Sequence, residues 1–250
     1  CASPLVINTR DFKYSERAKE QILSAYSEHF HFNGRISSNA KRTLFRSLIL
    51  MRIFFEVYES KNDVIVDLNN YEIYKKYINK LISENDKIDF ENILNNMVLN
   101  MITNSEYSWV EINELNIDSE SFAELQKVLD NNFLISKTYI ENEGLITESK
   151  KECLYFVFDE LRDFCISRYL LKAGEGTEYK ELFSLCTDLY DKRKAPLEGI
   201  LKYSYMHFKS TAQFEFCTRI LFSYCNEKVH HWKYDDRSRW HERRTELFHN

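Results

Sequence analysis

Apolar side chains recur every three or four residues along most of the chain, which is the spacing of amphipathic helices. The first such segment begins after Ser15, which we expect to be the N-cap, and ends near Phe30. Residues 40–59 are apolar nearly all round, which predicts a single helix surrounded by neighbours. Two more helices are predicted near residues 71–82 and 89–103.

The next section changes from helical to strand-like spacing. A short helix is predicted near residues 109–115 and another over 119–131. Residues 133–139 then alternate like a strand, a polar stretch follows, and 153–158 form a second strand. Together with the preceding helix, this is the order helix, helix, helix, strand, polar wing, strand, which predicts a winged-helix domain.

A helix leaves the second strand directly, with no glycine or proline between them, in the sequence CLYFVFDELRDFCISRYLL. We expect Asp159 to cap this helix, with Glu160 and Asp163 in its positive first turn. Gly174 is placed as the C′ residue at the other end.

Beyond this helix, the stretch GEGT (174–177) is predicted to be a hinge. Three more helical patterns follow, and the second of them begins at Pro196, which suits the first position of a helix. Paired helices of this length resemble the start of an α-solenoid, although no repeat period is found in the sequence.

Composition supports a mostly helical protein. Among 250 residues there are only 5 Gly and 2 Pro, too few turn-forming residues for a sheet of many strands. The net charge of −5 gives no overall positive field that would attract nucleic acid or an anionic membrane. The six cysteines show no paired spacing, and we expect buried free thiols in the reducing cytoplasm.

No membrane span or targeting signal is predicted. The longest apolar stretch, residues 44–58, is shorter than a bilayer requires and is interrupted by Arg46, Arg52 and Glu56. The sequence opens on CASPLVINTRDF without an initiator methionine or a basic segment, so we expect a fragment of a longer protein.

The chain carries no convincing catalytic or metal-binding motif. GEGTEYK (174–180) lacks the GxxxxGK[ST] spacing of a phosphate-binding loop and follows a helix rather than a strand. A zinc site can be considered at one group of residues, but its C-x7-C-x4-H-H spacing is not that of a structural finger and two of its cysteines fall on apolar helix faces. That group is Cys217, Cys225, His230, His231 and His241. We therefore expect no metal ion, no cofactor bound by this chain alone and no catalysis.

A winged helix suggests DNA binding, but its charges argue against that function. The segment that would read the major groove, 119–131, carries Glu120, Glu124 and Asp130 against only Lys127, so it would repel phosphates. Packing against protein is the stronger inference for this domain, and we expect no nucleic acid partner.

Four stretches, in this order, resemble the STAND class of signal-transducing NTPases, especially the bacterial antiviral branch and its NACHT-type relatives. INTRDFKYSERAKEQILSAY (7–26) resembles the segment that follows the last strand of the ATPase core. SLILMRIFFEVYE (47–59) is similar to the family's lid helix, and YEIYKKYINKLI (71–82) to the tyrosine-rich helix after it. CLYFVFDELRDFCISRYLL resembles the end of the family's winged-helix domain, and the whole resemblance covers about residues 5–172.

The resemblance implies a switch that couples the nucleotide state of an ATPase core, outside this chain, to a C-terminal sensor. The lid and winged helix would close over ATP or ADP in the parent protein and open when the sensor recognises a ligand, for example a foreign phage protein. Opening would allow the parent to form a homo-oligomer in the cytoplasm. The parent would then be an ATPase, while its partners would be the core and sensor of the same polypeptide.

Two positions depart from the family pattern. Where relatives often have a proline against adenine this chain has Leu48, and where many have a histidine that contacts phosphate it has Phe158. These are the candidate nucleotide-facing residues, although an apolar ring cannot donate a hydrogen bond to phosphate. Arg52, Arg162 and Arg168 are the candidate interface contacts, chosen from their positions.

We thus predict a mostly α-helical protein with three parts: a helical lid domain (1–86), a winged helix with a two-stranded wing (87–172) and the first sensor helices (173–250). Two other functions stay open. One is a winged-helix DNA-binding regulator, and the other is a helical scaffold or adaptor with no link to nucleotide.

Overall fold

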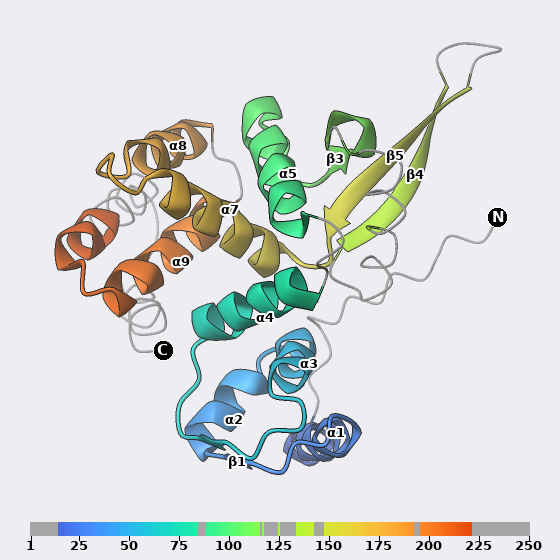
Figure 1. The fold of residues 1–250 in the computed structure, drawn as a ribbon, viewed down its shortest axis with the longest axis vertical. Helices are drawn as coiled ribbons and strands as arrows, with labels where there is room; N and C mark the ends of the chain where they lie inside the picture. The colour runs from blue at the N-terminus through green and yellow to red at the C-terminus, as the bar shows by residue number, and fades with distance from the viewer. Residues whose placement is uncertain are drawn as a thin grey trace, which may run out of the picture. The chain divides into compact units, whose positions relative to one another are not determined.

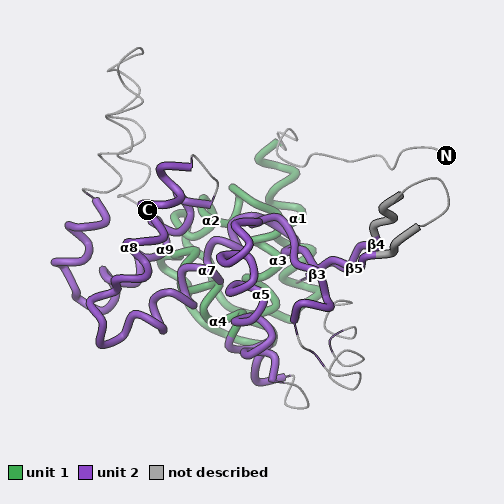
Figure 2. Tube along the Cα trace, turned by 90° about the horizontal axis from the view of Figure 1, so that it is seen from above, with its two compact units in different colours: residues 1–78 green, residues 79–250 purple. Residues whose placement is uncertain are grey.

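The computed structural model describes residues 15–84, 89–115, 117, 125, 134–142, 148–192 and 196–221. Two compact units make up the chain, residues 1–78 and residues 79–250 (Figure 2). The described part is mostly helical, as predicted. Among the described residues, no helix combines the length and the apolar character needed to cross a membrane. The domain boundaries predicted at residues 86 and 172 stay predictions.

The first unit packs short helices around aromatic side chains. It contains α1 (Glu16–His29), β1 (Arg35–Ile36), α2 (Ser38–Leu44), α3 (Leu48–Val57), β2 (Val64–Ile65) and the start of α4 (Asn70–Glu84). Phe54 and Phe55 of α3 are fully buried and meet the ring of Phe32 edge-on, each with 5.7 Å between centroids. Such pairs add to the apolar area that holds these helices together.

The single helix predicted over residues 40–59 is wrong, because the chain forms α2 and α3 instead. Ser47 has extended backbone (φ −149°, ψ 124°), and its hydroxyl accepts a hydrogen bond from the Leu50 amide. An N-cap that satisfies a free amide of α3 therefore starts a new helix. Ser15 caps α1 in the same way, as predicted, by accepting from the Ala18 amide.

A parallel pair of short strands, β1 and β2, was not predicted. Arg35 pairs with Val64 and Ile36 with Ile65, and α2 and α3 lie between the two strands in sequence. Two residues per strand are too few to show the alternation by which strands are recognised in a sequence.

The second unit combines helices with a three-stranded sheet (Figure 1). In chain order its described elements end with a helical stretch over residues 214–221. Those before it are the end of α4, then α5 (Phe90–Asn104), β3 (Val110–Glu111), the 3₁₀ helix η2 (Ile112–Leu115), β4 (Leu134–Asn142), β5 (Glu148–Phe156), α7 (Asp159–Ala173), α8 (Lys180–Asp191) and α9 (Leu197–Ser210).

The sheet has the order β3–β5–β4, and both pairings are antiparallel. β4 and β5 form a hairpin whose register runs from Leu134 opposite Phe156 to Asn142 opposite Glu148. The predicted strands, 133–139 and 153–158, were placed too far from the turn. The polar residues between each predicted strand and the turn also belong to the strands. An antiparallel ribbon can accommodate them because it does not need apolar side chains on both faces.

Two other predictions in this unit need correction or remain open. The short helix predicted near 109–115 is confirmed only at its end, since Val110 and Glu111 form β3 and the 3₁₀ helix η2 begins at Ile112. The helix predicted over 119–131 lies outside the described residues except for Leu125, which is helical and fully buried.

Positive φ occurs at Gly176, Glu178 and Tyr179 in the turn between α7 and α8. Gly174 is the C-cap of α7 in right-handed conformation, so the predicted left-handed C′ role is wrong. Glu178 and Tyr179 take positive φ values of 55° and 56° instead. A Cβ on Gly174 would lie 2.6 Å from Cδ1 of Tyr179, which leaves room only for glycine there.

Candidate functional site

At the β5–α7 junction a strand passes into a helix with no glycine or proline between them. β5 ends at Phe156, and α7 begins at Asp159 after an extended N-cap residue, Phe158 (φ −153°, ψ 150°). The Phe158 carbonyl accepts hydrogen bonds from the amides of Leu161 and Arg162 at 3.2 and 3.4 Å. The prediction that Asp159 caps the helix is therefore wrong, since Asp159 is the first helical residue.

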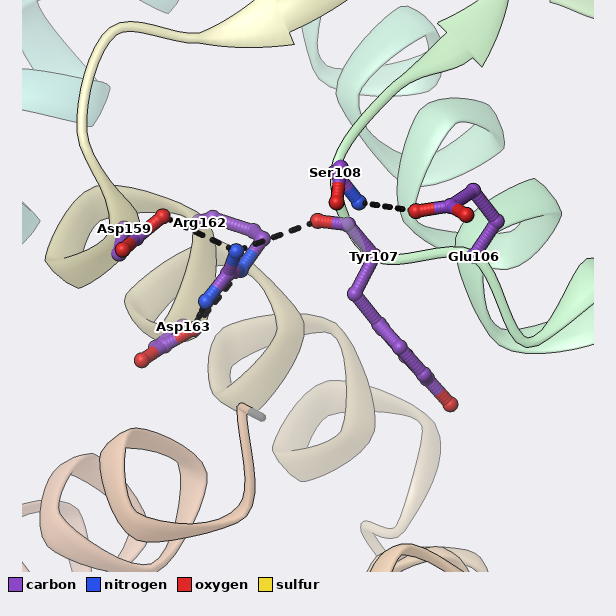
Figure 3. Close-up of polar contacts among 6 residues, drawn as sticks. All are labelled: Glu106, Tyr107, Ser108, Asp159, Arg162 and Asp163. Carbon is purple, nitrogen blue, oxygen red and sulfur yellow. Dashed lines mark hydrogen bonds and ion pairs between the residues drawn. The ribbon is translucent and has the colours of Figure 1, made fainter. Parts of the chain in front are cut away.

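A buried arginine organises the first turn of α7 (Figure 3). Arg162 is 9% exposed, and both its Nε and its Nη2 donate to Oδ1 of Asp163, at 2.9 and 2.8 Å. Its Nη1 donates to Oδ1 of Asp159 at 3.1 Å and to the carbonyl oxygen of Tyr107 at 3.3 Å. The charge-assisted bonds to Asp159 and Asp163 stay within α7. The Tyr107 contact ties α7 to the segment between α5 and β3.

The loop that presents Tyr107 is itself held in place. Ser105 ends α5 in left-handed conformation (φ 52°), and its amide bonds back to the last turn of that helix. The carboxylate of Glu106 accepts a hydrogen bond from the Ser108 amide at 2.8 Å (Figure 3). Tyr107 thus offers its carbonyl to Arg162 from a constrained backbone.

Asp163 lies between Arg162 and helix α9. A Cβ built on Gly199 of α9 would fall 2.0 Å from Oδ2 of Asp163 and 2.5 Å from its Cβ. Only a residue without a side chain fits opposite this carboxylate. Burial raises the pKa of Asp163 to about 6, more than the neighbouring Arg162 guanidinium lowers it, while Asp159 and Glu160 add to the increase.

We expect this carboxyl to make stability depend on pH. Its pKa rises from 3.8 to about 6 on folding, so the folded state binds its proton more tightly. The resulting stabilisation is complete below pH ~4 and is lost as the pH rises through about 6, a change of roughly 3 kcal/mol at most. Chemical denaturation of the wild type and of Asp163→Asn measures this directly. The difference between their free energies of unfolding should change over this range, whereas a constant difference would contradict the assignment.

Two further contacts fix α7 along its length. Burial acts to raise the pKa of Glu91 on α5, yet Arg168 at 2.7 Å and Lys172 at 3.3 Å hold that pKa below its ordinary value. On the face toward α9, the hydroxyls of Ser167 and Ser204 lie 2.9 Å apart, and both residues are buried. α7 is thus joined to α5 by charges and to α9 by close packing of small side chains.

The structure places the predicted interface arginines in contacts within the chain. Arg162 belongs to the buried cluster and Arg168 to the pair with Glu91, as described. Arg52 of α3 donates to Glu56 one turn later on the same helix, at 2.6 Å. The role of these residues in contacting other parts of a larger protein stays a prediction.

The predicted nucleotide-facing residues lie in different units. Leu48 is the first residue of α3 and Phe158 the N-cap of α7, and both are half-buried. Each unit is described by itself, so the nucleotide-facing role of both residues stays a prediction.

Three features of the cluster were not predicted: the contacts of Tyr107 and of Gly199, and the burial of Asp163. Asp163 was predicted to lie in the positive first turn of the helix, but it lies beyond that turn and is only 9% exposed. A glycine inside the helical pattern LEGILKY was the available signal for close helix packing, and it was not used.

No catalytic or metal-binding arrangement emerges from the described residues. Cys153, Cys165, Cys186 and Cys217 are free and buried, as predicted for these four. Burial raises the pKa of the Cys165 thiol to about 12, which makes it unreactive at neutral pH. Within the described ranges no three metal-ligating side chains gather, and the other members of the zinc group considered above lie outside them.

The cluster joins α7 to the Tyr107 segment and brings it close to α9 through buried contacts. No protein-family model, curated protein or solved structure matches this chain.

Proposed function

We propose that this chain is the regulatory part of a bacterial antiviral STAND-type NTPase, in which a helical lid, a winged helix and the first sensor helices couple the nucleotide state of an ATPase core to ligand recognition. The resemblance of four sequence stretches motivates the proposal. ATP or ADP would be bound by the core, with this chain covering it in the resting state.

The observation that carries the proposal is the way in which α7 is fixed at three places. It follows β5 after two residues, contacts Tyr107 and α5 through Arg162 and Arg168, and packs against α9 through its small residues. A helix joined in this way to a sheet on one side and to the downstream helices on the other can move them together. That is the mechanical requirement of a coupling element.

The sheet supports the winged-helix interpretation. α5 precedes the short strand β3, and the long β4–β5 hairpin follows a segment in which Leu125 is helical. β5 is central and continues into α7. A long hairpin that follows α5 and η2 and leads into a helix is what we expect of the wing of that domain.

Phe158 provides the experiment. In the complete polypeptide that contains this chain, Phe158→His would restore the residue with which many relatives contact phosphate. We expect release of labelled ADP, measured by stopped-flow displacement, to slow about tenfold, since a histidine can donate a hydrogen bond to the charged phosphate.

The control is Val157→His, one residue earlier and also half-buried. It should leave the release rate unchanged, because the neighbouring side chain points elsewhere. If Phe158→His changes neither affinity nor exchange, position 158 does not face nucleotide. If the complete polypeptide has no GxxxxGK[ST] motif and binds no nucleotide, the STAND proposal itself is wrong.

A further inference from the structure

The loop between α1 and β1 contains Asn33–Gly34, the one asparagine–glycine pair in the sequence. An asparagine can react with its own chain, because the next backbone nitrogen is held close enough to the side-chain carbonyl carbon to close a five-membered ring. A side chain on the next residue obstructs that approach, and glycine has none. Whether the reaction occurs in a folded protein depends on whether both groups are free to meet.

The fold requires the glycine at this position. A Cβ on Gly34 would lie 2.1 Å from the carbonyl oxygen of Asp63 and 2.4 Å from Cζ of Phe32. Neither distance leaves room for a methyl group, and the Asp63 carbonyl is itself held by a hydrogen bond from the Arg35 amide. The residue after Asn33 is therefore fixed as the one that obstructs ring closure least.

The backbone nitrogen of Gly34 is available for this reaction. Among the described residues it makes no hydrogen bond, although the amides on both sides of it do. Those of Asn33 and Arg35 donate to carbonyls within residues 61–63, at 3.1 and 3.0 Å. The Asn33 side chain is exposed, and its amide donates to the carbonyl of His31 at 3.1 Å. Ring closure thus breaks no backbone hydrogen bond at Gly34.

Asn104 is the matched comparison, because a small residue, Ser105, also follows it. Its side-chain amide donates to the Glu114 carboxylate at 3.1 Å, and the Ser105 backbone amide donates to the Ile102 carbonyl at 3.2 Å. Both groups that would have to react are therefore engaged at the end of α5. The structure protects Asn104 and leaves Asn33 open.

We propose that Asn33 is a site of spontaneous deamidation in the folded chain. The Gly34 nitrogen loses its proton and bonds to the side-chain carbonyl carbon of Asn33, and ammonia leaves with the side-chain nitrogen. Water then opens the cyclic imide at one of its two carbonyls, which gives aspartate or isoaspartate. Each product carries a new negative charge, and isoaspartate adds a methylene to the main chain beside β1. The reaction is independent of the proposed function, since it needs neither nucleotide nor another part of a larger protein.

Peptide mass spectrometry follows the reaction in the complete chain, kept at mildly alkaline pH and sampled over days. We expect the peptide that contains Asn33 to convert to two products of equal mass, aspartate and isoaspartate, which separate on chromatography. Their joint appearance is the signature of the cyclic imide, because direct hydrolysis of the amide gives aspartate alone. Asn33→Gln should abolish both products, since glutamine would have to close a larger ring that forms more slowly.

Unfolding in urea separates the effect of the fold from that of the sequence. It releases the hydrogen bonds at Asn104 but removes little from Asn33, so we expect it to speed conversion at Asn104 about tenfold or more relative to Asn33. Equal acceleration at the two sites would overturn the proposal, since the reaction would then proceed through unfolded chains. So would an Asn33 that stays intact in the folded chain while it converts in urea, or conversion to aspartate alone.

Discussion

Replacing Arg162 by alanine is expected to destabilise the second unit by about 3–5 kcal/mol. The substitution leaves the Asp163 carboxylate buried without its partner and removes the donor from the Tyr107 carbonyl. Breaking one side of a buried pair is destabilising because a desolvated charge remains, and Arg162 and Asp163 are each only 9% exposed. Equilibrium denaturation in urea, followed by far-UV circular dichroism, measures the loss.

Two companion variants separate this cause from a general loss of packing. Lys192→Ala breaks the exposed pair with Asp188 and should change stability by less than about 0.5 kcal/mol. Arg162→Ala combined with Asp163→Asn should recover much of the loss, because asparagine leaves no unpaired charge. A double variant as unstable as Arg162→Ala alone would show that the buried charge is not the cause.

Placing a methyl group on Gly199 is expected to force α7 and α9 apart. The added Cβ would lie 2.0 Å from Oδ2 of Asp163, well inside van der Waals contact, and three atoms of that side chain are within 2.5 Å. Overpacking of this kind destabilises by about 1–3 kcal/mol, which exceeds the gain of roughly 0.5–1 kcal/mol from alanine as the better helix former. Thermal unfolding of Gly199→Ala measures the net loss.

A double-mutant cycle identifies the clash as the cause. With Asp163→Gly as the background, the three side-chain atoms that the new methyl group would meet are gone. Gly199→Ala should then be neutral or stabilising. The same loss in both backgrounds would show that Asp163 does not limit how closely the two helices approach.

Helical periodicity was a good guide wherever one face of a long segment is buried. Ser15 as the cap of α1, the long helix around Met97 and the helix after Phe158 all follow from repeated apolar positions with polar ends. Such segments are recognisable because burial of the apolar face is what stabilises them.

The predictions failed where a single local interaction outweighs the pattern. The Ser47 hydroxyl divides an apolar run that looks continuous, and β1 and β2 are too short to leave a pattern. Of the Arg162 cluster, only the arginine itself was selected from the sequence, because of its position in the helix. Its partners could not be predicted. Tyr107 lies 55 residues before Arg162 and Gly199 lies 37 residues after it, so only the fold of the unit brings Tyr107 to Arg162 and Gly199 to Asp163.

The turn at Tyr179 limits how far the chain can be shortened. Two successive non-glycine residues with positive φ are strained by about 1 kcal/mol each, and neighbouring contacts must offset that strain. Those contacts come from later in the sequence: the Tyr179 ring meets Phe208 and Phe216, each at 4.8 Å, and its hydroxyl donates to Gln213 at 3.1 Å. A polypeptide that ended after α8 would keep the strained turn and lose all three. The smallest autonomous version of this unit therefore includes the helical residues 214–221.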